Sequence, residues 1–180
     1  MLRFLAAVFT ALTLAACASV PEEVTRADVP GLTAQITALN PDVDPEEAAR
    51  AARIAYTYPL ELKRTYNVTD SPLVHNAKVN QGLRPRGLCW HWADDLEARL
   101  WQENFQTLTF HRAIANATNI RIQHSTVIIA AKGKGMNDGV VLDPWRYGGY
   151  LFWSPTLQDE RYDWVARQTV FEERRQRQNR

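Results

Sequence analysis

The sequence predicts an α+β fold in which a cysteine-bearing helix packs on an antiparallel sheet. The helix is indicated by apolar residues that recur at helical spacing, namely Leu88, Trp92, Leu96 and Leu100. The sheet is indicated by three runs with strand character that follow one another in the chain, at residues 106–115, 120–131 and 140–142. Because neighbouring strands joined by short turns pair antiparallel, the expected topology is a meander.

The N-terminal residues 1–16 are expected to be a signal peptide. A short basic start precedes an uncharged apolar run over residues 4–16, which is short for a membrane span. The run ends in Leu-Ala-Ala-Cys, which resembles the lipobox of bacterial lipoproteins, where cleavage leaves a lipidated cysteine as the first residue. We therefore expect a lipid anchor at Cys17 that holds the protein on a membrane of the bacterial cell envelope, facing the periplasm. Ala18 after it favours the outer membrane. A plain secretory signal with an incidental cysteine is the alternative.

Charge and cysteine content narrow the functional classes. Loss of Arg3 with the signal peptide would bring the formal net charge from +1 to 0, so no basic excess remains and no nucleic-acid partner is expected. The chain has 2 cysteines, and lipid on Cys17 would leave Cys89 as the lone thiol of an exported protein. Such a thiol is either reactive or packs as a small hydrophobe.

Domain organisation follows from the distribution of proline and charge. Residues 17–43 are expected to form a lipidated tether, because prolines and acidic residues interrupt them, and residues 44–180 to form one domain. Asp44 and Pro45 are typical of a helix start. The helix is expected to weaken before Pro59, with a further helical segment after it.

Three other segments surround the predicted sheet. Residues 69–81 are polar and irregular, and they approach the cysteine from its N-terminal side, so they are expected to form one wall of a cleft. Residues 146–165 are rich in aromatic side chains and predict either a final hairpin or an aromatic cover over the sheet. Residues 172–180 are charged and predict a solvated helix end.

Cys89, His124 and Asp143 predict nucleophilic catalysis. A thiol in the first turn of a helix is shifted towards thiolate by the helix dipole. His124 lies on the second predicted strand and Asp143 ends the third, and the glycine-rich turn at residues 132–139 would place these strands side by side. A cysteine helix on the same sheet face would bring the sulfur to the imidazole. The thiolate would attack an acyl carbon, the histidine would protonate the leaving group, and the carboxylate would orient the imidazole.

The sequence around these residues resembles the transglutaminase-like group of papain-type cysteine enzymes. The similarity consists of Gly-Leu-Cys-Trp at 87–90, His-Ser-Thr-Val-Ile at 124–128 and Val-Leu-Asp-Pro-Trp at 141–145. The resemblance implies a papain/transglutaminase-like α+β fold, with acyl transfer from an amide of a peptide, protein or peptidoglycan peptide through a thioester. It implies no cofactor. Papain-type enzymes often place a glutamine before the cysteine as an oxyanion donor, which makes Gln81 a candidate beside the backbone N–H of Cys89.

Alternative interpretations remain open. A peptidoglycan amidase or endopeptidase of another papain-type family would also use a cysteine before a histidine. A catalytically degenerate domain, with Trp90 and Trp92 filling the cleft, would serve as a binding or scaffolding lipoprotein. A metal site is not expected, because its four candidate ligands do not converge on one helix face: Cys89, His91, Asp94 and Asp95. Trp145 is expected to shield the His124–Asp143 pair from water.

Overall fold

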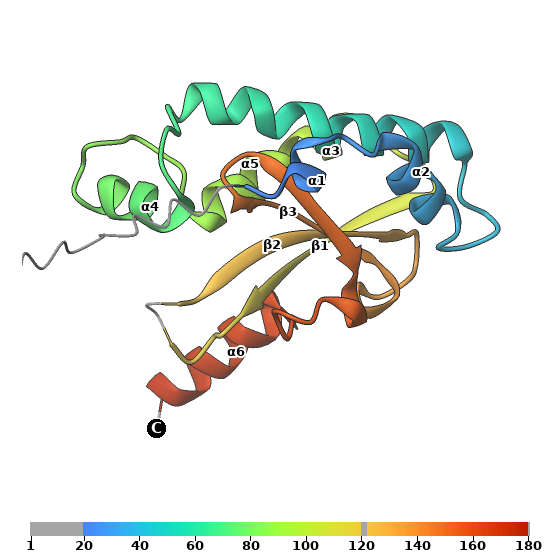
Figure 1. The fold of residues 1–180 in the computed structure, drawn as a ribbon. Coiled ribbons are helices and arrows are strands. Elements are labelled where there is room, and N and C mark those ends of the chain that lie inside the picture. The colour runs from blue at the N-terminus through green and yellow to red at the C-terminus, as the bar shows by residue number, and fades with distance from the viewer. Residues whose placement is uncertain (1–19, 120–121, 180) are drawn as a thin grey trace, which may run out of the picture.

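The computed structural model describes residues 20–119 and 122–179 as a single antiparallel sheet with helices on both of its faces (Figure 1). The five strands lie in the order β4-β3-β2-β1-β5. Their bounds are Leu108–Ala115 for β1, His124–Ala131 for β2, Val140–Tyr147 for β3, Tyr150–Pro155 for β4 and Val165–Ala166 for β5. The first four strands follow one another as a meander, so the predicted α+β class with an antiparallel sheet is confirmed.

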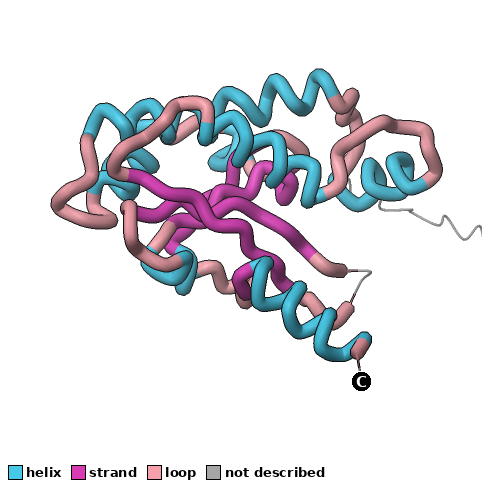
Figure 2. The backbone as a smooth tube through the Cα atoms, turned by 180° about the vertical axis from the view of Figure 1, so that it is seen from behind, coloured by secondary structure: helices cyan, strands magenta, loops and turns pink. Residues whose placement is uncertain are grey.

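Helices form the layers above and below this sheet. Their bounds are Glu22–Thr25 for α1, Val29–Thr37 for α2, Pro45–Thr65 for α3, Pro72–Asn80 for α4, Cys89–Trp101 for α5 and Arg167–Gln178 for α6. Two short 3₁₀ turns are η1 (Met136–Asp138) and η2 (Thr156–Gln158). Helices α2, α3 and α5 enclose the main core with one face of the sheet, and α6 lies on the opposite side (Figure 2).

The main core depends on close packing of α3. Its buried face carries four alanines without exposed surface, Ala48, Ala51, Ala52 and Ala55. Small side chains let the helix approach its neighbours closely, and larger core residues from α2, α5 and the facing strands pack around it. The cysteine-bearing helix is therefore held between α3 and the sheet.

The domain begins earlier than expected. Asp28 caps α2 by accepting a hydrogen bond from the Gly31 N–H at 2.9 Å, and Leu32 and Ile36 are fully buried against α3. The prediction that residues 17–43 form a tether is therefore wrong from residue 29 onwards, because α2 belongs to the core. Residues 1–16 and Cys17 lie outside the described residues. Within the described part of the chain, no helix is both long enough and apolar enough to cross a membrane.

Helix α3 starts as predicted but does not stop at its proline. Asp44 accepts a hydrogen bond from the Glu46 N–H at 2.7 Å, and Pro45 takes the first helical position. The helix continues through Pro59, which is buried. The missing N–H of Pro59 removes one backbone hydrogen bond, and burial of residues on both sides of it, such as Ala55 and Leu62, offsets that loss.

Helix α4 occupies part of the segment expected to be irregular. Ser71 is extended before it and Pro72 takes the first helical position. Because only His75 is buried, the helix lacks the apolar stripe that would have revealed it in the sequence. The expectation of an irregular segment over residues 69–81 is therefore wrong for residues 72–80.

The C-terminal third combines both arrangements expected for residues 146–165. Strands β3 and β4 form a hairpin whose turn contains Gly148 and Gly149, both with positive φ. The chain then returns across the sheet, with Tyr162 and Trp164 against its outer face, before β5 pairs with β1. The charged tail continues α6, which buries only Val170.

Candidate active site

The turn before Cys89 is built by its neighbours. Gly87 has φ of +124°, and a Cβ there would lie 2.3 Å from Nε2 of His75, so only glycine fits. His91 Nδ1 accepts hydrogen bonds from the N–H groups of Gly87 and Leu88 at 3.1 and 3.2 Å. Burial and the nearby charge of Arg86 lower the pKa of His91, which favours this neutral, accepting form. Cys89 is thus the first residue of α5, as predicted.

The two tryptophans beside the cysteine do not block the site. Trp92 is fully buried, packs edge-on against Tyr66 and donates a hydrogen bond from Nε1 to the Gly87 carbonyl at 2.9 Å. Trp90 is 46% exposed and packs on the ring of His91. Both stabilise the helix start, and neither fills a cleft as the degenerate-domain alternative supposed.

His124 and Asp143 meet directly. His124 Nε2 lies 2.7 Å from Asp143 Oδ2, and both side chains are 1% exposed. Strands β2 and β3 pair with Val127 opposite Leu142, so the two residues stand diagonally on one face. Nδ1 of His124 is buried and has no hydrogen-bond partner among the described residues. The carboxylate therefore holds one ring nitrogen and leaves the other for a second group.

Cys89 is placed beside that imidazole. Its sulfur lies 3.8 Å from the carbonyl oxygen of Gln123, the residue before His124. Burial lowers the pKa of His124, but the charge and hydrogen bond of Asp143 and the neighbouring Cys89 outweigh it and raise the pKa to about 9. The imidazole is therefore protonated at neutral pH. The structure brings the three sequence-predicted residues, Cys89, His124 and Asp143, into one cluster.

The approach of sulfur to imidazole differs from the expectation. His124 shares its side of β2 with Ile128, which packs with Val141 and Trp164 on the outer face of the sheet. Helix α5 packs on the other face, against Val127 and Ile129. The prediction that the cysteine helix lies on the same sheet face as His124 is therefore wrong. The sulfur reaches the imidazole around the end of β2, because Cys89 begins its helix where that strand begins.

Behind Asp143 lies a buried ionic network that sequence reasoning missed. Asp143 accepts hydrogen bonds from the backbone N–H of Arg146 at 3.1 Å and from its Nε at 2.9 Å. The same guanidinium donates two hydrogen bonds to Asp159, at 3.1 and 2.6 Å. Burial raises the pKa of Asp143, but the charges of His124 and Arg146 overcome it and keep the pKa below its usual value. Asp143 is therefore ionised and fixed in orientation.

Aromatic rings enclose the imidazole on its remaining sides. Ring centroids of Trp145, Tyr162 and Trp164 lie 4.6, 4.8 and 5.4 Å from that of His124. Trp164 also donates a hydrogen bond from Nε1 to Asp159 at 3.0 Å. Trp145 therefore lies against the His124–Asp143 pair, where the sequence suggested it would exclude water. Tyr162 and Trp164 belong to the aromatic segment that was expected to cover the sheet, but their contact with His124 had no local signal, because a loop brings them there.

A cleft of about 970 Å³ opens beside this cluster. His124 and Trp145 line it, as do residues 68–73 together with Asn76. The expectation that residues 69–81 provide a wall of the cleft is confirmed for residues 69–73 and for Asn76. Cys89 itself is 9% exposed and is not among the residues that line the cleft. The cleft is large enough for a short stretch of peptide.

The structure does not bring Gln81 to the thiol. Gln81 follows the last residue of α4, is exposed and does not line the cleft. Asn76 from the same helix does line it, and its Oδ1 accepts a hydrogen bond from Trp145 Nε1 at 3.0 Å. Because Trp145 Nε1 can only donate, the amide orientation of Asn76 is set and its NH₂ group remains as a donor. Asn76, rather than Gln81, is therefore the side-chain amide to test as an oxyanion donor.

The four residues considered for a metal site have separate partners. Asp94 pairs with Arg112, and Asp95 pairs with Arg86 at 2.6 Å and with the Tyr66 hydroxyl. His91 Nδ1 is occupied by the turn before α5. Over residues 20–119 and 122–179, no three His, Cys, Asp or Glu side chains cluster closely enough to hold a metal ion.

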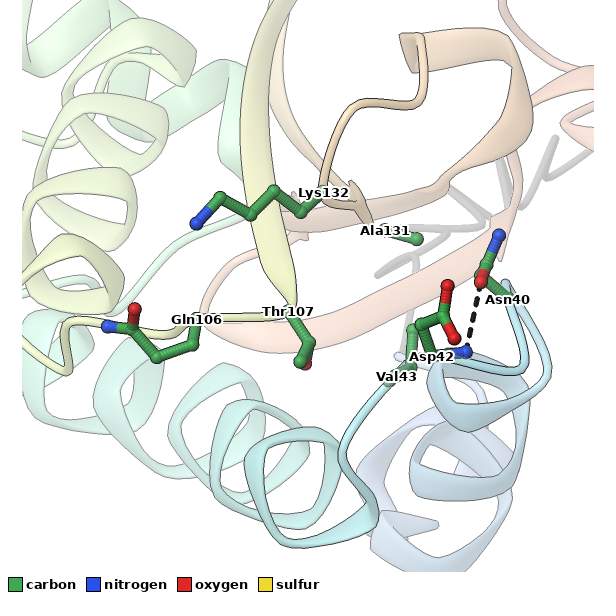
Figure 3. A pocket seen from close by; sticks show the side chains of 7 residues that line it. All are labelled: Asn40, Asp42, Val43, Gln106, Thr107, Ala131 and Lys132. Carbon is green, nitrogen blue, oxygen red and sulfur yellow. Dashed lines mark hydrogen bonds between the residues drawn. The ribbon is translucent and has the colours of Figure 1, made fainter.

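A second, smaller pocket of about 260 Å³ lies at the other end of the β1–β2 pair (Figure 3). It is lined by Asn40, Asp42, Val43, Gln106, Thr107, Ala131 and Lys132. Asn40 Oδ1 accepts a hydrogen bond from the Asp42 N–H at 3.0 Å, which closes the turn after α2. The lining of this pocket contains no cysteine and no histidine, whereas His124 lines the larger cleft.

Comparison of the chain with models of known protein families, with curated proteins and with solved structures found no match. The function is therefore argued from the geometry of the site.

Proposed function

We propose that this protein is a cysteine hydrolase or acyltransferase that acts on an amide through a thioester, with a papain/transglutaminase-like domain. The buried His124–Asp143 hydrogen bond of 2.7 Å, with Nδ1 of His124 unpaired beside Cys89, carries the proposal. A carboxylate that orients an imidazole towards a nucleophile is the arrangement that acyl transfer requires.

Each residue has a defined step in this reaction. The thiolate of Cys89 attacks the amide carbon, and a C–S bond forms as the carbonyl becomes an oxyanion. The imidazolium of His124 gives its proton to the leaving nitrogen, and the C–N bond breaks to release an amine and leave a thioester. Water or an acceptor amine then gives a proton to His124 and attacks the thioester, which returns the thiolate. Asp143 stabilises the charged imidazole throughout.

The proposed setting is the bacterial cell envelope. The signal peptide and the lipid at Cys17 would anchor the protein to a membrane, the outer one by preference, with the domain facing the periplasm. Val20, the first described residue, lines the same cleft as His124. Only Ala18 and Ser19 separate Val20 from Cys17 in the sequence, so the chain limits the distance between the two residues to about 10 Å. The site would therefore act on peptides, proteins or peptidoglycan peptides near that membrane.

Alkylation of Cys89 tests the proposal. At about pH 6.5, where free thiols are mostly protonated, iodoacetamide is expected to react about tenfold faster with the wild type than with His124→Ala, because the imidazolium stabilises the thiolate. Protein with Cys17→Ser would make Cys89 the only thiol. His111→Ala, on the exposed part of β1, serves as the matched control and is expected to keep the wild-type rate. Equal rates for wild type and His124→Ala would refute the catalytic pair.

One observation favours a second candidate function, that of a catalytically degenerate binding or scaffolding lipoprotein. Cys89 is 9% exposed, and its thiol is directed to the Gln123 carbonyl rather than to the cleft. A thiol held in this way would be a packing element. Reaction with iodoacetamide only after unfolding would favour this function over the enzyme.

Replacement of Asn76 tests the oxyanion assignment. Asn76→Ala is expected to lower kcat for an amide substrate about 10²-fold, the usual cost of removing one oxyanion donor, with little change in KM. Gln81→Ala is the matched control and is expected to leave kcat unchanged, since Gln81 is exposed outside the cleft. Steady-state kinetics on both variants would decide which side chain is the oxyanion donor. A loss of kcat in Gln81→Ala alone would support Gln81, the residue that the sequence suggested.

A further inference from the structure

The charged residues that line the cleft are not balanced. Two of them are neutralised by partners within the protein: Arg146 lies between Asp143 and Asp159, and Asp70 pairs with Lys78 at 2.7 Å. His124 is paired with Asp143. These groups add little net charge for a ligand to meet.

Lys63 and Arg161 line the same cleft without an acidic partner among the described residues. Lys63 Nζ lies 4.3 Å from the centroid of the Tyr150 ring, and the Arg161 guanidinium lies 5.5 Å from that of Tyr162. Glu160 and Asp163 are close to Arg161 in the sequence, but neither forms an ion pair with it or lines the cleft. The cleft therefore carries two uncompensated positive charges.

These two cations come from different elements around the catalytic cluster. Lys63 lies in the last turn of α3, and Arg161 follows η2. The lining of the cleft is partly apolar, because it includes Leu73 and Ile122, which are 70% and 58% exposed. Aromatic rings under both cations hold their charged ends in place while leaving them available to a ligand. The surface thus combines apolar contacts with two fixed positive charges.

We infer that the amide cleaved or transferred by this site belongs to an acidic peptide, with substrate carboxylates bound by Lys63 and Arg161. This inference rests on the proposed function for the reaction, but it concerns binding alone. Opposite charges across a half-enclosed surface favour the correct ligand and speed its encounter, and the effect declines as salt screens the charges. A neutral peptide of equal size would make the same apolar contacts without the ionic ones.

Binding to the intact chain with Cys89→Ala tests the inference without any chemistry. The probes are two fluorescein-labelled peptides, Ala-Glu-Ala-Glu-Ala and Ala-Gln-Ala-Gln-Ala, measured by fluorescence anisotropy. The glutamate peptide is expected to bind about tenfold more tightly at low salt, and the preference is expected to shrink at about 0.3 M salt. The double variant Lys63→Gln, Arg161→Gln is expected to lose the preference for the glutamate peptide. The matched control is a second double variant, Lys132→Gln, Lys134→Gln, at the other end of β2, which is expected to keep that preference.

The outcomes separate this inference from the proposed function. Equal affinity for the two peptides, no binding of either at millimolar concentration, or a preference that persists in the Lys63 and Arg161 variant would overturn the inference, whatever the alkylation experiment gives. A preference that depends on those two cations, together with an unreactive Cys89, would keep the acidic-peptide site and reject the enzyme.

Discussion

Replacing Asp143 by asparagine is expected to lower amide turnover about 10⁴-fold. An asparagine whose oxygen accepts the hydrogen bond from the Arg146 backbone N–H, as Asp143 Oδ1 does, has its NH₂ group at the Oδ2 position, facing His124 Nε2. The imidazole would be forced into the tautomer with its proton on Nδ1, where it cannot take a proton from the thiol or the attacking water. Asp163→Asn, on the exposed surface, is the matched control and is expected to keep full turnover.

The pH dependence of the same variant sharpens the test. In the wild type the pKa of His124 is raised from 6.5 to about 9, so turnover is expected to fall above about pH 9 as the imidazolium loses its proton. The contribution of His124 to the stability of the fold is fully present below about pH 6.5, and it is lost as the pH rises through about 9. In Asp143→Asn, only the neighbouring Cys89 would oppose the lowering of the His124 pKa by burial. The pH above which turnover falls is therefore expected to be lower in the variant than in the wild type. Turnover within tenfold of wild type would contradict the role of Asp143.

Local sequence patterns were sufficient where neighbours in the chain determine the structure. Asp44 and Pro45 start α3 because a cap and a fixed φ need only adjacent backbone groups. The meander followed from strands joined by short turns, and it brought His124 to Asp143 because adjacent strands share a face. The candidate site could be predicted to this extent because its cysteine, histidine and aspartate are attached to regular elements.

Tertiary contacts decided the features that the sequence did not reveal. Arg146 and Asp159 have no pattern in common, and only the return of the chain after η2 places them together. Leu32 and Ile36 of α2 are buried by α3, although prolines and acidic residues in the same segment indicated a tether. The side of β2 that faces α5 could not be decided from alternation either, because β2 is buried on both faces.

The Arg146 guanidinium is expected to be the most sensitive point of the fold. It lies between two buried carboxylates, and Arg146→Met would leave Asp143 and Asp159 close together without the cation that compensates them. Removing one partner from a buried ion pair costs about 3–5 kcal/mol of the free energy of unfolding. Arg167→Met provides the control, because its ion pair with Asp94 is 3.7 Å long and the two side chains are 39% and 40% exposed. Such a pair contributes at most about 1 kcal/mol.

The direction of the pH dependence gives the decisive measurement. In the wild type the pKa of Asp143 is lowered, so its stabilising contribution is lost as the pH falls through that value. In Arg146→Met, His124 would still pair with Asp143, but one buried carboxylate would be left without a cation. Protonation of a carboxylate would relieve that charge, so the variant is expected to gain stability between pH 7 and about pH 5. Urea unfolding at the two pH values would measure the slope. A variant that loses stability over this range would show that the carboxylates are compensated by groups other than Arg146.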